Sequence, residues 1–278
     1  MSKIVIGNIP VNLSAEKALQ KYLLWLEPFK QAHTSPEVGL QFFCADEISI
    51  HGNRIYSEDG LEWLQDGSDY EVVIYSRTDN KPIAIMRADS NWRNISITGT
   101  YKALPGVFRT MSEIAFRTTI LFYQGIVLHA SAIDYNGKGL VFSAPSGTGK
   151  STHANLWALH KGAEILNEDR PAIRITEGQV RVFGSPWSGA SNHFLNKSAP
   201  LIAIFLLEQS LENEVVVISP REALQRLAAR CYLPYFDRSL LEMALDNIGL
   251  TMEKVPVYML KCRPDKQSVE KVISWLNL

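Results

Sequence analysis

The sequence has few cysteines and no long apolar run, and each absence argues against a class of protein. Its three cysteines are Cys44, Cys231 and Cys262, and no two of them form a C-x-x-C pair. An odd number without that spacing fits a reducing cytoplasm better than a disulfide framework or a zinc site. No stretch approaches the roughly 18 apolar residues that a spanning helix needs, and no signal-peptide pattern is visible. We therefore expect a cytoplasmic protein without membrane association.

The chain also lacks an excess of charge of one sign. Its 28 basic and 29 acidic residues leave a formal net charge of −1 at pH 7. Bulk attraction to nucleic acid or to an anionic membrane requires a basic excess. We expect neither partner, so an anionic ligand would need a locally built site. Apolar residues make up 46%, which is ordinary for a globular protein.

A change of pattern near residue 105 predicts two domains. Residues 1–105 read mainly as short β-branched strands separated by turn residues, with a helix over 15–26 that Ser14 would cap. This part contains no recognisable chemical motif, and we expect a β-rich accessory domain that recognises the substrate. Strands and helices alternate over 106–278, which predicts an α/β catalytic domain.

The second domain begins with an amphipathic helix over 107–123 and an apolar strand over 126–134. Asn136-Gly137 is typical of a hairpin turn into a second strand over 139–143. Further strands are expected over 163–166, 170–175, 179–183, 201–207 and 255–261, and helices over 150–160, 220–230, 238–249 and 267–276.

Between the second strand and the next helix lies a glycine-rich loop, residues 144–151, of sequence APSGTGKS. It matches the phosphate-binding pattern G-x-x-x-x-G-K-[S/T], with Ala144 in place of the first glycine. Glycines let backbone N–H groups point inward around phosphates, and the following helix directs its positive dipole end at them. Lys150 would reach the β- and γ-oxygens and the Ser151 hydroxyl would bind Mg²⁺. We expect ATP to contact Ser146, Gly147, Thr148, Gly149, Lys150, Ser151 and Thr152.

An acidic pair, Glu168 and Asp169, follows the short apolar strand after this helix. Carboxylates at a strand end beside a phosphate loop bind Mg²⁺ or accept a hydroxyl proton. A solvated acidic turn is the alternative, and the nearby loop favours the functional interpretation. We expect Asp169 to bind the metal with Ser151, while the sequence leaves open which carboxylate acts as the base.

His129 lies within an otherwise apolar strand that should pair with the strand entering the loop. One interpretation is a core histidine bonded to backbone groups, and the other is a catalytic group that contacts the γ-phosphate or metal-bound water. Pairing with the loop strand would bring it near the phosphates in either case.

A polar loop over 184–189, GSPWSG, follows a predicted strand. Ser185, Ser188 and an exposed Trp187 would contact the substrate. A structured turn with the tryptophan packed on the core is the alternative.

Together, residues 129–133, 144–152 and 165–169 resemble the catalytic domain of HPr kinase/phosphorylase, whose fold is shared in outline with phosphoenolpyruvate carboxykinase. The resemblance implies that the family's strand histidine falls on His129 and its paired aspartates on Glu168 and Asp169. Glu168 departs from that pattern, and the glycine-rich signature of true HPr kinases is not visible. Residues 184–189 and 200–208 look more like the HPr-kinase-like proteins of ribosomal-peptide biosynthesis, among them lasso-peptide tailoring kinases.

This resemblance implies an ATP- and Mg²⁺-dependent kinase that phosphorylates a hydroxyl, with a serine of a peptide or small protein as the expected acceptor. Two alternatives stay open: a kinase of a small molecule such as free serine, and a nucleotide-binding regulatory protein without turnover. The sequence indicates no oligomeric state.

Overall fold

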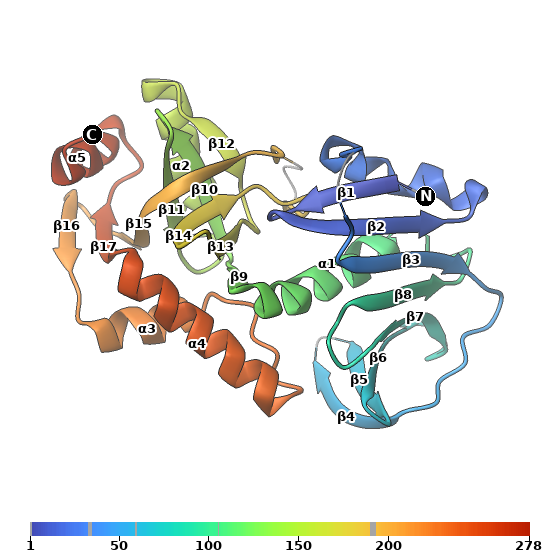
Figure 1. Ribbon diagram of the computed structural model, residues 1–278. Helices are drawn as coiled ribbons and strands as arrows, with labels where there is room; N and C mark the ends of the chain where they lie inside the picture. Colours follow the sequence, from blue (N-terminus) through green and yellow to red (C-terminus); the bar gives the residue numbers. More distant parts are fainter. Residues whose placement is uncertain (1, 33–34, 59, 105, 190–192) are drawn as a thin grey trace. The chain divides into compact units, whose positions relative to one another are not determined.

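The computed structural model describes residues 2–32, 35–58, 60–104, 106–189 and 193–278, and the chain forms two compact units (Figure 1). The first unit contains Met1–Phe122 and Pro234–Leu241, and the second contains Tyr123–Leu233 and Glu242–Leu278. Both mix strands and helices. The boundary expected at residue 105 therefore falls inside the first unit.

The first unit is built on an eight-stranded sheet in the order β1-β2-β3-β8-β7-β6-β5-β4. Strand β3 runs parallel to both of its neighbours, while every other adjacent pair is antiparallel. The strands are β1 (Ser2–Ile6), β2 (Ile9–Ala15), β3 (Val38–Cys44), β4 (Asn53–Glu58), β5 (Leu61–Asp66), β6 (Asp69–Tyr75), β7 (Pro82–Ala88) and β8 (Asn94–Gly99).

A 3₁₀ helix, η1 (Lys17–Phe29), follows β2. It begins after Glu16, so the prediction of Ser14 as its N-cap is wrong. Ser14 instead belongs to β2, where it pairs with Gln41 of β3. Serine is a preferred N-cap residue, but here the pairing of Ser14 in the sheet overrides that local preference.

Helix α1 (Gly106–Thr119) packs on β7 and β8 and continues into a short 3₁₀ helix, η2 (Ile120–Tyr123). The Phe108 ring lies 4.8 Å from the Phe42 ring. A Cβ on Gly99 would come within 2.8 Å of Val107, so the helix sits directly on the sheet. This burial explains why the first unit extends beyond the predicted boundary.

The second unit contains a nine-stranded sheet. Its main path is β12-β10-β11-β15-β14-β13-β9, and β17 pairs with both β15 and β16. Strands β11, β15 and β17 run parallel to one another. The strands are β9 (Gly125–Val127), β10 (Ala130–Tyr135), β11 (Lys138–Ser143), β12 (Glu164–Asn167), β13 (Ala172–Thr176), β14 (Gln179–Phe183), β15 (Ser198–Gln209), β16 (Glu214–Val217) and β17 (Val257–Cys262).

The single strand expected over 126–134 is divided in two at Leu128 and His129. Strand β9 pairs with β13, whereas β10 pairs with β11 and β12. Between them the Leu128 N–H donates to the Pro171 carbonyl and the His129 N–H to the Arg230 carbonyl. The backbone changes partners here, and His129 lies at the change.

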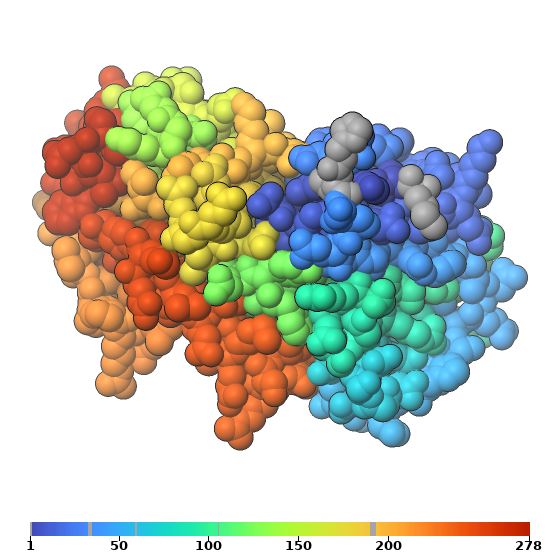
Figure 2. All heavy atoms as spheres, viewed as in Figure 1, coloured from blue at the N-terminus to red at the C-terminus, as the bar shows by residue number. Residues whose placement is uncertain are grey.

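Helices α2 (Lys150–Lys161), α3 (Pro220–Ala228), α4 (Arg238–Lys254) and α5 (Lys266–Leu276) complete the fold. Gly162, at φ +67°, ends α2, and the Ser219 hydroxyl caps α3 by accepting from the Glu222 N–H. Helix α2 contacts α5, and both appear at the surface of this unit in Figure 2, yellow-green and red. None of the helices within the described ranges combines the length and apolarity that crossing a bilayer requires.

Candidate active site

The glycine-rich loop joins the carboxyl end of β11 to the amino end of α2. Gly147 and Gly149 have φ angles of +77° and +106°, a region that residues with a Cβ rarely adopt. A Cβ on Gly147 would have no neighbour within 4 Å, so the backbone conformation, not crowding, favours glycine there. The first helical hydrogen bond runs from the His153 N–H to the Gly149 carbonyl at 2.9 Å. The loop thus has the form of a phosphate cradle closed by a helix start.

Lys150 is the buried member of the loop, with 7% of its surface exposed. Its ammonium donates to the carbonyls of Ala144 at 3.2 Å and Pro145 at 3.5 Å. Burial lowers the pKa of Lys150, the Asp169 carboxylate acts to raise it, and the Arg230 guanidinium lowers it further. The other residues expected to contact the nucleotide lie at the open side of the loop and at the first turn of α2: Ser146, Gly147, Thr148, Gly149, Ser151 and Thr152.

His129 and Asp169 form a contact beside this loop. The His129 Nε2 lies 3.2 Å from the Asp169 Oδ1, and the Arg170 Nε lies 3.5 Å from Oδ2. The His129 side chain is 30% exposed, so the interpretation as a core histidine bonded to backbone is wrong. Burial opposes the charged form of Asp169, but the hydrogen bond from His129 and the charges of Arg170, His129 and Lys150 together lower its pKa. The carboxylate is therefore ionised at neutral pH.

Backbone bonds hold this pair in place. The Ala130 N–H donates to the Asp169 carbonyl at 3.1 Å, and the Ser143 hydroxyl donates to the His129 carbonyl at 2.9 Å. Ser143 is the last residue of β11, so one hydrogen bond connects the histidine to the strand that enters the loop.

Asn167 fixes the acidic turn, a role that the sequence did not reveal. It is fully buried. Its Oδ1 accepts from the N–H groups of Asp169 and Arg170 at 2.9 and 2.6 Å, and its Nδ2 donates to the carbonyls of Ser185 and Trp187 at 2.9 and 3.1 Å. One amide side chain thus connects the acidic turn to the loop over 184–189.

Glu168 has different surroundings from Asp169. Its carboxylate lies 3.9 Å from the His193 Nδ1, and its side chain is 7% exposed. The Ser131 hydroxyl donates to its carbonyl. The structure therefore brings Asp169 together with His129 and the charge of Lys150, and places the Glu168 carboxylate beside His193.

The loop over 184–189 is packed inward. Trp187 is only 3% exposed, so the expectation of an exposed tryptophan is wrong and the packed turn is what the structure has. Ser185 is also buried, and its hydroxyl donates to the Arg170 carbonyl at 2.6 Å. Trp187 and Ser185 therefore stabilise the turn by packing and hydrogen bonding.

The end of this loop passes directly over the acid. A Cβ on Gly189 would lie 3.1 Å from the Asp169 Oδ2, so glycine leaves space beside the carboxylate. Ser188 is 4% exposed, and its hydroxyl has no hydrogen-bond partner among the described residues. Of the three predicted substrate contacts, Trp187 and Ser185 are packed into the turn, and Ser188 is buried beside them.

Arg230 is a charged residue near the loop that the sequence analysis missed. Its carbonyl accepts from the His129 N–H at 2.8 Å, and a bridge pairs Leu128 with Cys231. Its side chain is half-buried and donates at 3.5 Å to the Ala229 carbonyl. Nothing in the local sequence points to it, because its proximity to Lys150 arises only when the end of α3 pairs with the segment around His129.

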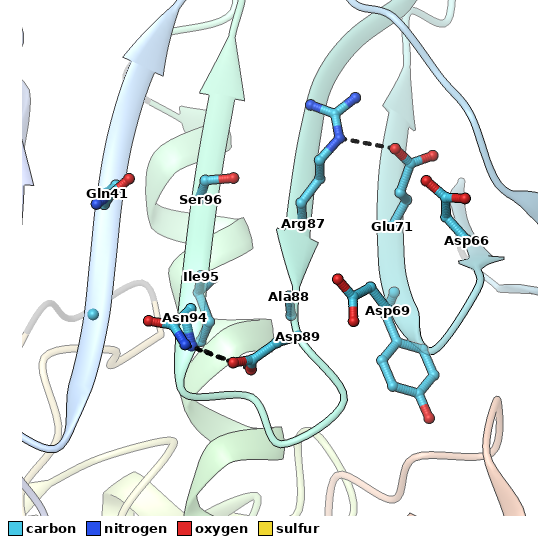
Figure 3. A pocket seen from close by; sticks show the side chains of 12 residues that line it. Gln41, Asp66, Asp69, Glu71, Arg87, Ala88, Asp89, Asn94, Ile95 and Ser96 are labelled. Atoms are coloured by element: carbon cyan, nitrogen blue, oxygen red, sulfur yellow. Dashed lines mark hydrogen bonds and ion pairs between the residues drawn. The ribbon is translucent and has the colours of Figure 1, made fainter.

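A separate cavity of about 320 Å³ lies in the first unit (Figure 3). The Glu71 carboxylate in its wall accepts from the Arg87 Nε at 2.8 Å, and Asp89 accepts from the Asn94 side chain at 2.7 Å. Asp66 and Asp69, at the turn between β5 and β6, form no ion pair within the described part of the chain. Asp66 and Asp69 therefore add negative charge to the cavity wall beyond the Glu71–Arg87 pair.

One family model matches this chain. It is described as SynChlorMet cassette protein ScmC, and it matches residues 107–272, which is more than half of the 278 residues. The chain belongs to the ScmC family. The match to ScmC includes His129, Lys150 and Asp169 and begins with α1.

No curated protein matches the chain. Among solved structures, the chain is similar to one titled "Structure of the Hpr(Ser) kinase/phosphatase from Coxiella burnetii", with 10% sequence identity and a TM-score of 0.31, over 54% of this chain and 95% of that one. At that TM-score the likeness carries no conclusion about activity.

Proposed function

We propose that this ScmC-family protein is an ATP- and Mg²⁺-dependent kinase that phosphorylates a hydroxyl, with a serine of a peptide or small protein as the acceptor. The observation that carries the proposal is the ionised Asp169, held by His129, in the electrostatic field of a lysine that closes a phosphate cradle. A cation for the phosphates and a carboxylate for the acceptor are the two groups that this reaction requires.

The backbone of 146–152 and the Lys150 ammonium bind the phosphates. The acceptor oxygen forms a bond to the γ-phosphorus, the bond from that phosphorus to the bridging oxygen breaks, and ADP leaves. A carboxylate of the acidic turn, Glu168 or Asp169, orients the acceptor hydroxyl and accepts its proton. His129 holds Asp169 in place beside the transferring group. Positioning and charge neutralisation supply most of the catalysis in such reactions.

The oxygen donors at this site suit Mg²⁺. Ser151 is exposed at the first turn of α2, and Asp169 is an ionised carboxylate, so both offer hard oxygen ligands. No cluster of three or more His, Cys, Asp or Glu side chains forms a complete metal site within the described ranges. This suits an ion that takes its other ligands from phosphates and water. The ion would neutralise charge on the phosphates.

The peptide acceptor is the finer part of the proposal. It is supported by the first unit, a complete domain with its own sheet and its own negatively charged cavity. A role in lasso-peptide tailoring, suggested by the sequence resemblance, is part of the same proposal.

Lys150→Ala tests the proposal. Loss of one strong electrostatic contact should lower turnover on the order of 10²–10³-fold, measured as transfer of label from γ-³²P-ATP to a panel of serine peptides. Lys138→Ala is the matched control, because Lys138 is exposed at the opposite end of β11.

A Lys150→Ala variant with normal turnover overturns the proposal. Transfer to free serine and to no peptide favours a small-molecule kinase. Tight ATP binding without transfer to any acceptor favours a regulatory protein without turnover.

A further inference from the structure

A cavity of about 660 Å³ opens directly beside the phosphate loop. Its walls come from the loop, from the start of α2 and from the ends of β15 and β17. The lining residues from the loop and α2 include Gly147, Thr148 and Gly149, and those from the strand ends include Leu207, Gln209 and Cys262. Pockets for small ligands commonly occupy about 300–1,000 Å³, so this volume accommodates a nucleoside.

The order of the strands sets the cavity apart from the catalytic groups. On one side of β11 lie β10 and β12, and on the other lie β15 and β17. His129 and Asp169 flank the first pair, whereas Gln209 and Cys262 are paired residues at the ends of the second. The loop after β11 therefore lies between the catalytic pair and the cavity. In open α/β sheets, ligands bind outside the carboxyl ends of the strands, which is this edge.

The cavity wall is mostly apolar, with a polar edge. Leu207, Leu211 and Pro264 contribute hydrocarbon surface. Burial, with a smaller contribution from Asp265, raises the pKa of the Cys262 thiol to about 11, so this side chain is also uncharged. Gln209 offers an amide that can both donate and accept hydrogen bonds.

Leu211 is the most solvent-exposed of the large apolar side chains in this wall. It is 87% exposed, although it lies in a built turn where the Ser210 N–H donates to the Cys262 carbonyl and the Ser210 hydroxyl accepts from the Glu212 N–H. An apolar side chain held at the edge of a cavity gains from a flat apolar ligand that covers it.

We propose that this cavity holds the purine base and ribose of the nucleoside triphosphate, with Leu211 covering one face of the ring. The inference rests on the proposed function and adds the orientation in which the nucleotide binds. The base lies on the β15–β17 side of the loop, and the γ-phosphate lies on the β10–β12 side, next to Asp169.

Calorimetric titration with two ligands tests this assignment. Mg·ATP presents a base and three phosphates, whereas Mg·tripolyphosphate presents the phosphates alone. We expect the full-length protein to bind ATP about tenfold or more tightly than tripolyphosphate, as burial of a ring predicts. Leu211→Asp should weaken ATP binding by about tenfold, because it places a charge against the ring, and should leave tripolyphosphate binding unchanged. Leu159→Ala is the control, since Leu159 is 75% exposed on α2 and lies outside the cavity wall.

Each outcome decides between the two claims. Equal affinity for ATP and tripolyphosphate, or normal ATP binding by Leu211→Asp, overturns the base site and leaves the phosphate cradle standing. Binding of neither ligand by the wild-type protein overturns the proposed function together with the base site. Equal loss of both ligands in Leu211→Asp shows damage to the loop and also counts against the base site.

Discussion

Arg230 and Lys150 place two positive charges at the candidate site, close enough that the Arg230 charge lowers the pKa of Lys150. Lys150 is held by carbonyls of its own loop, while Arg230 is placed by a backbone bond to His129. Like charges repel, and this repulsion contributes to the lowered pKa of Lys150. Two cations that repel each other are tolerated best when an anion of high charge lies near both, and a triphosphate is such an anion.

Arg230→Ala should therefore lower kcat on the order of 10²-fold, with a much smaller change in ATP affinity, because the charge developing on the transferred group needs more neutralisation than the ground state. Single-turnover phosphotransfer and ATP titration separate the two effects. Arg226→Ala is the control: Arg226 lies in the last turn of α3, shortly before Arg230, and pairs with Glu222 at the surface. An unchanged kcat in Arg230→Ala would show that the guanidinium plays no part in transfer.

At the level of elements, a buried histidine connects α2 to α5. The Trp157 Nε1 donates to the His153 Nε2 at 3.3 Å, and the Ser268 hydroxyl lies 3.4 Å from Nδ1. Nε2 must then be unprotonated, which makes the ring neutral. Burial lowers the pKa of His153 to about 4. The helix that starts at the phosphate loop thus depends on a neutral imidazole.

Acid should weaken this connection. Below pH 6.5 the unfolded chain protonates its histidine, while the folded chain resists protonation until about pH 4, so stability is lost as pH falls through that window. Protonation of His153 in the unfolded chain should lower the free energy of unfolding by about 2 kcal/mol between pH 7 and pH 5, measured by urea denaturation. His153→Gln should be less stable at pH 7 but should lack this pH dependence. His160→Gln, at an exposed position of the same helix, should keep it, and an equal pH dependence in His153→Gln would refute the assignment.

Hydrophobic periodicity and the residues that end helices and strands predicted most elements of the second unit. Gly162, Ser219 and the Asn136-Gly137 turn set element boundaries through local backbone conformation and hydrogen bonds, so they can be recognised in sequence. These local signals failed where contacts between distant segments determine the structure. Ile126, Leu128 and Ala130 are all buried, so the apolar run is continuous even though the backbone changes strand partners at His129. Trp187 could not be placed inside from sequence, because the turn that holds it is bonded to Asn167, and the hydrogen bonds of Asn167 appear only in the fold.

The same limit holds for the site. The loop and the acidic pair lie close together in sequence and could be predicted from spacing. Arg230 and the cavity wall at Leu211 and Cys262 come from distant segments that meet at one sheet edge. No local pattern marks them.

At the scale of the whole molecule, the candidate site and the acidic cavity lie in different units. The candidate phosphotransfer residues all belong to the second unit. The first unit instead has a cavity with negative charge at Asp66 and Asp69. The ScmC match begins at residue 107, so most of the first unit lies outside it.

If the first unit recognises the acceptor peptide, its cavity should favour a peptide that carries lysine or arginine. Asp66→Asn with Asp69→Asn removes two negative charges at exposed positions, where the change should cost little stability. We expect KM for a basic peptide to rise about three- to tenfold, the range of one or two partly screened ion pairs, with ATP affinity and kcat unchanged. Raising the salt concentration should remove the difference between variant and wild type, because exposed charges are screened.

The matched control is Asp134→Asn on β10 of the second unit, outside this cavity. A double variant with an unchanged KM for every peptide tested would show that recognition of the acceptor does not use this cavity.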